Sequence, residues 1–389
     1  MFEDVILKVD LALDESEYDA ILVFGPDNVR YLSGAHLPFH QSFADRHMGV
    51  LWPKGGEPVC ICPVEWESSF LSLSWINSTC RYIEELGTPG VIIETIAPLV
   101  EASVEKGGKI GVDARRVSSA FYTILEEALN RYELEACDSW LGELRMTKTS
   151  SELEFLSEIA YRTDHGILGA THHVLVTSVR SEMSLSEEIR VHCMERGLDV
   201  VGHHSLSQVA SGEHAGKFWP LAPKYGLGYD KHLKPDEYVR LEMRASLDGY
   251  WSDAARLMTM GEPTDEQISA YMALIALRDV ALERLTPGEK CSEVYEAVKE
   301  EAKSRGVKLV QGLAIGHGIG VTDHEPPFLR ANDDTELEDG MVLVLDPVIY
   351  GPKGEILRSK DIVILTEDGP CVVGWYKDWR EPYIANHTL

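Results

Sequence analysis

Positive charge is scarce in this sequence. It contains 36 Lys and Arg residues against 64 Asp and Glu residues, so its 389 residues carry a formal net charge of -28 at pH 7. A charge of this sign and size repels phosphate backbones and anionic lipid head groups. We therefore expect neither nucleic acid nor a membrane surface as a partner.

Long apolar runs and a cysteine framework are also missing. No apolar stretch approaches the roughly 18 residues that a membrane-spanning helix needs. The seven cysteines are an odd number, and they are scattered singly except for Cys60 and Cys62. The first residues, MFEDVILKVDLALDESEY, show no basic region ahead of an apolar stretch. We expect a compact, reduced, cytoplasmic protein.

Short apolar runs followed by turn residues recur in the first third of the chain. Residues 21–24, 49–52 and 59–62 have this form, which is typical of strands. Helical periodicity appears at 118–129. The pattern predicts a mixed α/β domain with a mixed sheet.

A polar segment at 147–152 precedes a long amphipathic stretch. We place the domain boundary just before it, which gives an N-terminal domain at 1–143 and a second domain at 144–389. In the second domain, Thr264 and Gln267 have the spacing of a capping box that opens a helix.

One segment of the second domain alternates strictly between apolar and charged residues. Its charged positions are Arg240, Glu242 and Arg244. This period of two is typical of a half-buried strand. Asp248-Gly249 then predicts a two-residue turn into a second strand, so the second domain is expected to be α+β with antiparallel hairpins.

The turn also predicts the register of this hairpin. If Asp248-Gly249 is the whole turn, Leu247 faces Tyr250. Arg244 then lies opposite Asp253, and Glu242 is diagonal to Asp253 on the same face. We therefore expect two carboxylates and a guanidinium to lie together on one face of the hairpin.

Six short segments of the second half carry a resemblance through their order and spacing. They are 209–212 (VASG), the hairpin 242–256, 316–320 (GHGIG), 324–327 (HEPP), 337–342 (LEDGMV) and 366–369 (TEDG). Together they resemble the pita-bread family, which holds methionine aminopeptidase, prolidase, aminopeptidase P and creatinase. Residues 26–34 also resemble the opening of the creatinase and prolidase branch. The resemblance implies a creatinase-like N-terminal domain followed by a pita-bread domain.

Prolidase-like members of that family bind two divalent metals through Asp, Asp, His, Glu and Glu. Such ions generate a hydroxide at neutral pH and polarise the scissile carbonyl. The matching positions here are Glu242, Asp253, His317, Asp346 and Lys360. Because an ammonium cannot coordinate a metal while protonated, Lys360 argues against a two-metal site.

Two further positions depart from the metal-binding members. Arg244 stands where these enzymes usually have Gly, and a guanidinium there would pair with Asp253. With Lys360, it resembles a protein-built substitute for metal charge, and we expect Arg244 to bind substrate. Trp219 aligns near the substrate-facing His of the metal enzymes, and we expect Trp219 to contact substrate.

Creatinase is the metal-free branch of the family, and its N-terminal domain contributes an Arg to the partner subunit's site. The segment 44–50 resembles the segment that carries that Arg. The resemblance implies a homodimer in which Arg46 binds substrate in the other chain's cavity.

The leading hypothesis is a hydrolase that cleaves a carbon–nitrogen bond of a small carboxylate-bearing substrate without a metal or other cofactor. The expected roles are proton transfer by His317 or His324, activation of water or binding of a cationic group by Glu242, Asp253 and Asp346, and oxyanion stabilisation by Arg244 and Lys360.

Two alternatives remain open. One is a metal-dependent Xaa-Pro dipeptidase or aminopeptidase that binds a dipeptide and keeps one Mn, Co, Zn or Fe ion. Its ligands would be Glu242, Asp253, His317 and Asp346. The other is a catalytically inactive pita-bread module that binds a peptide or a histone.

Overall fold

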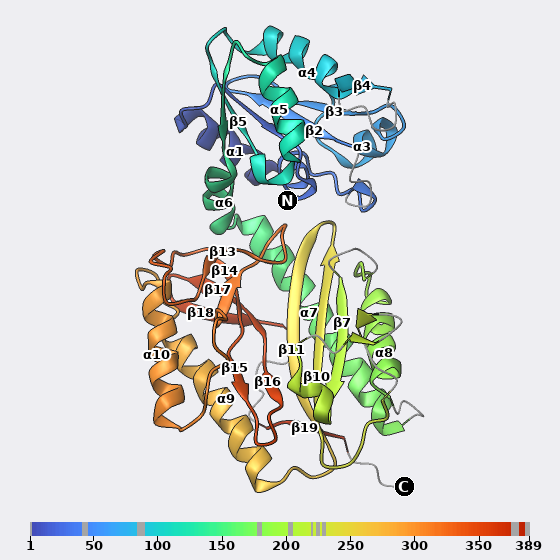
Figure 1. Ribbon diagram of the computed structural model, residues 1–389, viewed down its shortest axis with the longest axis vertical. Coiled ribbons are helices and arrows are strands. Elements are labelled where there is room, and N and C mark those ends of the chain that lie inside the picture. The colour runs from blue at the N-terminus through green and yellow to red at the C-terminus, as the bar shows by residue number, and fades with distance from the viewer. Residues whose placement is uncertain are drawn as a thin grey trace. The chain divides into compact units, whose positions relative to one another are not determined.

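A computed structural model describes residues 2–40, 46–83, 90–176, 181–200, 205–218, 221–222, 226–227, 231–374 and 381–385. The chain forms two compact units, Met1–Arg145 (unit 1) and Met146–Leu389 (unit 2) (Figure 1). The sequence-based boundary between 143 and 144 falls inside helix α6 (Asp138–Met146). Within the described ranges, no helix has the length and apolar character needed to cross a bilayer.

Unit 1 is built on a six-stranded mixed sheet in the order β4-β3-β2-β1-β5-β6. Its strands are β1 (Ala20–Val23), β2 (Gly49–Pro53), β3 (Val59–Pro63), β4 (Thr79–Tyr82), β5 (Lys109–Val112) and β6 (Glu133–Ala136). Its other helices are α1 (Phe2–Glu15), α2 (Pro26–Ser33), α3 (Glu67–Leu73), α4 (Gly90–Ser103) and α5 (Ser119–Ala128), with a 3₁₀ turn at Ala114–Arg116.

The short apolar runs of unit 1 form strands because their side chains fill both faces of the sheet. All four residues of β1 are buried, and β1 pairs antiparallel with β2 and parallel with β5. The three predicted strands and the mixed sheet are therefore confirmed. The helix predicted at 118–129 is α5, whose Ser118 side chain accepts a hydrogen bond from the Phe121 backbone N–H.

Unit 2 contains two larger sheets, in the orders β19-β11-β10-β7 and β13-β12-β14-β17-β18. Their strands are β7 (Leu206–Ser211), β10 (Tyr238–Leu247), β11 (Tyr250–Met260), β12 (Gly316–Gly318), β13 (Glu325–Phe328), β14 (Val342–Leu345), β17 (Asp361–Thr366), β18 (Gly369–Val373) and β19 (Tyr383–Ala385). Two short pairs are β8 (Leu221–Ala222) with β9 (Gly226–Leu227) and β15 (Val348–Tyr350) with β16 (Ile356–Arg358).

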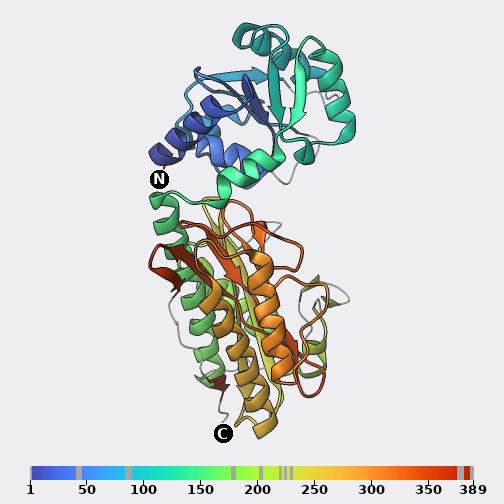
Figure 2. The same cartoon turned by 90° about the vertical axis from the view of Figure 1, so that its left-hand side faces the viewer.

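Helices pack against both sheets of unit 2. They are α7 (Ser150–Val176), α8 (Glu182–Met194), α9 (Asp265–Arg284) and α10 (Cys291–Ser304), with a 3₁₀ turn at Gly212–Gly216. Helices α7 and α8 contact β7, β10 and β11, whereas α9 and α10 lie side by side and share an apolar core with β14 and β17 (Figures 1 and 2). The capping box of Thr264 and Gln267 opens α9, as predicted.

The β10–β11 hairpin has the register that the turn predicts. Leu247 pairs with Tyr250 and Arg244 with Asp253. Asp248 has φ 46° and Gly249 has φ 80°, the left-handed values that a tight hairpin turn of this kind requires.

The prediction that β10 is half-buried is wrong. Arg240 and Glu242 are 1% and 2% exposed, so the charged face is as buried as the apolar face. The charged face of β10 is stable inside the protein because its charges pair with charges that belong to other elements. Burial of charge is tolerated only with such pairing.

The two larger sheets of unit 2 meet at one backbone hydrogen bond near these charges. The Lys360 N–H donates to the Ala255 carbonyl at 3.1 Å. The start of β17 therefore lies beside β11, two residues from Asp253. This contact brings segments more than 100 residues apart in the sequence into one site.

Candidate functional site

The six residues predicted to be catalytic come from six places in unit 2. The residues are Glu242 on β10, Asp253 on β11, His317 on β12, His324 just before β13, Asp346 just after β14 and Lys360 just before β17. All are buried except His324, whose side chain is 44% exposed.

Lys360 occupies the centre of the carboxylate cluster. Its Nζ lies 2.8 Å from both carboxylate oxygens of Asp253 and 3.4 Å from Oε2 of Glu242. Burial alone would raise the pKa of Asp253, but Lys360 and Arg244 outweigh burial and hold that pKa below its usual range. Lys360 is only 2% exposed, so it is not an ordinary surface lysine.

Arg358 neutralises the other two carboxylates, and sequence reasoning missed it. Its Nε and Nη2 donate to the two oxygens of Asp346 at 2.7 and 2.6 Å, and its Nη1 donates to Oε2 of Glu242 at 3.0 Å. Arg240 adds a contact of 2.8 Å to Glu242. Although burial opposes ionisation, Arg358, Lys360 and Arg240 lower the pKa of Glu242 to about 2.

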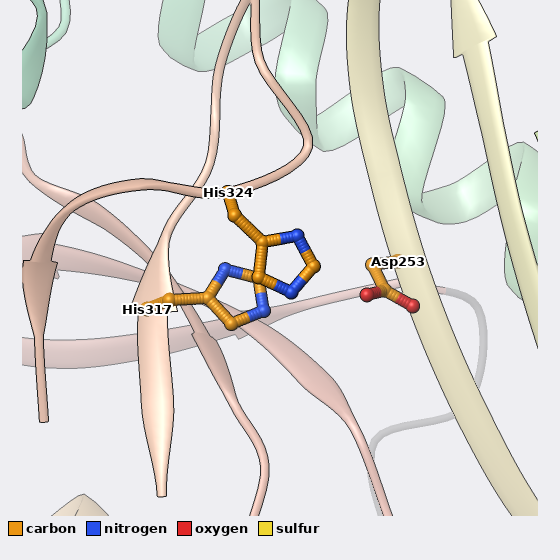
Figure 3. Close-up of side chains that lie close together, drawn as sticks. All are labelled: Asp253, His317 and His324. Atoms are coloured by element: carbon orange, nitrogen blue, oxygen red, sulfur yellow. The ribbon is translucent and has the colours of Figure 1, made fainter. Parts of the chain in front are cut away.

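The two histidines stack on one another beside Asp253 (Figure 3). Their ring centroids are 3.8 Å apart with an interplanar angle of 19°. The Nδ1–H of His317 donates to the Gly318 carbonyl at 3.0 Å, which leaves a lone pair on Nε2. That Nε2 atom is buried and has no hydrogen-bond partner among the described residues.

Glycine is required beside His317 because the chain packs closely there. A Cβ at Gly318 would lie 2.3 Å from the Pro326 carbonyl oxygen, and a Cβ at Gly316 would lie 2.7 Å from the Val344 carbonyl oxygen. The GHG sequence thus lets β12 approach both neighbouring strands and fixes His317 in the site.

One group of possible metal ligands occurs among the described residues. It consists of Asp253, His317 and His324, whose candidate ligand atoms all lie within 4.8 Å of one another. This set differs from the predicted four-ligand set, which has Glu242 and Asp346 in place of His324.

The residues predicted to bind substrate have three different outcomes. Arg244 faces Asp253, with Nε 3.6 Å from its Oδ2, and makes a closer contact to Asp323. Arg46 belongs to unit 1, where it pairs with Glu65 at 2.9 Å. Trp219 lies outside the described residues.

Comparison with known proteins gives the family of this chain. The model of metallopeptidase family M24 matches residues 157–367, and that of the Creatinase/Prolidase N-terminal domain matches residues 6–147. The chain belongs to metallopeptidase family M24. This membership confirms the predicted fold class, the predicted resemblance and the enzyme class, a hydrolase that acts on carbon–nitrogen bonds.

Similar proteins cover nearly the whole chain. An Xaa-Pro dipeptidase of Pyrococcus furiosus is 24% identical over 92% of this chain and 93% of its own length. An Xaa-Pro dipeptidase of Lactobacillus delbrueckii is 25% identical over 93% and 94%. The prolidase structure from Pyrococcus horikoshii has a TM-score of 0.78 at 20% identity over 97% and 99%. These similarities favour the metal-dependent peptidase alternative over the metal-independent reading.

Three residues of the site were not predicted from the sequence as site residues: Arg240, Arg358 and Asp323. The sequence signals that could have identified them differ in strength. Arg240 and Glu242 are two positions apart on one strand, and this spacing is a signal that they share a face. Arg358 precedes Lys360 by two residues, but no pattern connects it with Glu242. Asp323 adjoins His324 and still carries no motif of its own.

Proposed function

We propose that this protein hydrolyses the carbon–nitrogen bond of a dipeptide-sized, carboxylate-bearing substrate, with one divalent cation held by Asp253, His317 and His324. The observation that carries the proposal is the convergence of these three side chains, with a buried lone pair on Nε2 of His317. Membership of a metallopeptidase family supports it.

A pair of ions does not fit the same residues. A second ion would need Glu242 and Asp346 as ligands, and both already pair with Arg358. Two dications would add four positive charges to a buried cluster whose carboxylates are neutralised, and uncompensated buried charge is strongly unfavourable. The charge reversal at Lys360 is therefore incompatible with a two-metal site.

The residues of the site have distinct roles in this proposal. A cation at the three ligands would supply Lewis-acid polarisation of the scissile carbonyl. Lys360 keeps Asp253 ionised. Arg244 offers its guanidinium to the substrate carboxylate.

The metal-independent hydrolase is the second candidate, and the geometry of Lys360 favours it. An ammonium 2.8 Å from both oxygens of Asp253 occupies the position expected for a cation. In this candidate Lys360 and Arg244 stabilise the developing oxyanion, while His324 transfers the proton.

Hydrolysis of a panel of Xaa-Pro dipeptides, before and after chelation, separates the candidates. We expect activity that is lost on chelation, returns with Mn²⁺, Co²⁺, Zn²⁺ or Fe²⁺, and saturates at one ion per chain by elemental analysis. His317→Gln should abolish both ion binding and activity, whereas Asp339→Asn, a change at an exposed carboxylate, should alter neither. Activity that survives chelation would select the metal-independent hydrolase. A folded protein that cleaves none of the panel would contradict the proposal and favour the binding module.

A further inference from the structure

Asp323 links two groups of the site. It lies in the loop between β12 and β13, immediately before His324. Its Oδ2 is 2.5 Å from Nη1 of Arg244 and 3.4 Å from Nδ1 of His324. The Asp323 side chain is 18% exposed, so water screens these contacts only in part.

The loop that carries Asp323 is anchored at several points. The Trp251 N–H donates to the Gly320 carbonyl at 2.9 Å. The Thr322 hydroxyl donates to Oε2 of Glu325 at 2.8 Å, and Lys148 donates to Oε1 of the same carboxylate at 2.7 Å. Both side chains of the Lys148–Glu325 pair are almost fully buried. The position of Asp323 is therefore set by the fold.

Arg244 lies between two carboxylates. Its Nη1 contacts Asp323, and its Nε is 3.6 Å from Oδ2 of Asp253. A guanidinium held at both ends in this way loses little further freedom when a ligand binds. Asp323 thus orients the group that we assign to the substrate carboxylate.

His324 is constrained on its face and at its edge. The ring stacks on His317, and its Nδ1 faces Asp323. An ionised carboxylate can only accept a hydrogen bond. Asp323 therefore favours the His324 tautomer with the proton on Nδ1 and the lone pair on Nε2. The same arrangement orients histidines that bind metals.

We propose that Asp323 is a positioning residue that holds His324 in its Nδ1–H tautomer and fixes Arg244 at the same time. It leaves Nε2 of His324 available as a base or a ligand. The tautomer does not depend on any metal. Only the consequence for ion binding rests on the proposed function.

The test measures the side-chain ¹⁵N chemical shifts of His324 by NMR, under alkaline conditions in which histidine is neutral. His324→Gln assigns the resonance. We expect the Nδ1–H form in the unmodified protein and a shift of population towards the Nε2–H form in Asp323→Ala. Asp323→Asn, which keeps an acceptor oxygen, should retain more of the Nδ1–H form. The exposed Asp339→Asn change is the control and should leave the shifts unaltered.

If Asp323 serves only as the ion-pair partner of Arg244, a different result is expected. Asp323→Ala would then change thermal stability without changing the tautomer of His324. An Nε2–H form in the unmodified protein, or one tautomer in all variants, would overturn the inference. If Asp323→Ala does not fold, as judged by circular dichroism, the comparison with Asp323→Asn decides.

Titration with Mn²⁺ separates this inference from the proposed function. If both hold, Asp323→Ala should bind Mn²⁺ about 10- to 100-fold more weakly, as for other residues that orient a histidine ligand. A tautomer that shifts in a protein that never binds Mn²⁺ would contradict the proposed function and leave the role of Asp323 intact. Unchanged Mn²⁺ affinity with an unchanged tautomer would remove Asp323 from the site.

Discussion

Lys360→Glu reverses the charge at the centre of the site and tests our interpretation most directly. Lys360 contacts both oxygens of Asp253 at 2.8 Å and is 2% exposed. These values place it among buried ion pairs, for which removal of one partner costs about 3–5 kcal/mol, rather than among exposed pairs that contribute about 0–1 kcal/mol. The new carboxylate would also repel Asp253 and Glu242.

Without metal, we therefore expect Lys360→Glu to lower the free energy of unfolding by more than about 3–5 kcal/mol. Lys360→Met is the matched control, because it removes the ammonium without adding a negative charge. Lys360→Met should lower the free energy of unfolding by about 3–5 kcal/mol and should not create a metal site.

With Mn²⁺ present, Lys360→Glu should recover stability. An ion that binds only the folded state at 100 times its dissociation constant adds about 2.7 kcal/mol. Chemical denaturation with and without Mn²⁺ measures this gain. Elemental analysis should find one more ion in Lys360→Glu than in the unmodified protein, and electron paramagnetic resonance should show a coupled ion pair. Adding Arg244→Gly, which removes another positive charge, should tighten binding of the second ion.

Two results would refute this reasoning. If Lys360→Glu unfolds at the same denaturant concentration as the unmodified protein, Lys360 does not neutralise the buried carboxylates. If even the double variant Lys360→Glu with Arg244→Gly takes up no additional Mn²⁺, the correspondence of these positions with the family's ion site is wrong.

The quaternary structure, the Arg358 network and a buried histidine of unit 1 each give a further prediction. We expect a homodimer by light scattering, and Arg46→Ala should weaken substrate binding by about 2–5 kcal/mol, seen as a raised KM, while stability changes little. A stable monomer would contradict the first prediction, and an unchanged KM in Arg46→Ala would contradict the second. Arg358→Met should lower the free energy of unfolding by about 3–5 kcal/mol, measured by chemical denaturation. A loss below about 1 kcal/mol would show that the Arg358 network contributes little to stability. Burial and His47 lower the pKa of His40 to about 4, so the unfolded state takes up the proton first. Stability should fall by about 2 kcal/mol between neutral pH and about pH 5, and His40→Phe should lose this dependence.

The hairpin that carries Asp253 could be predicted from the sequence because its register depends on local chemistry. Asp248-Gly249 suits a two-residue turn, and the turn then fixes every pair along the two strands. The resemblance to the pita-bread family likewise led us to expect His317 and Asp346 near this hairpin, and the structure has His317 beside Asp253 and Asp346 on the same arginine as Glu242. These are features that a few neighbouring residues determine.

The neutralisation of the site could not be predicted in the same way. Arg358 contacts Glu242 across 116 positions of sequence, and no local pattern records that contact. The alternation along β10 normally marks one face as solvent-exposed. Here that face is buried because the charges of other strands meet it, which only the tertiary structure reveals.

The balance of charge in the buried cluster also bears on substrate choice. Glu242, Asp253 and Asp346 contribute three negative charges, and Arg240, Arg358 and Lys360 contribute three positive charges. A single dication at Asp253 and the two histidines would therefore leave a positive surplus in a poorly solvated place. A surplus of this kind is stabilised by an anion that arrives with the substrate. Ion binding and carboxylate binding should consequently strengthen each other, since the coupling between two ligands is reciprocal. A C-terminally amidated dipeptide, which lacks the carboxylate, should show no such coupling. This comparison distinguishes charge compensation from simple occupancy of the site.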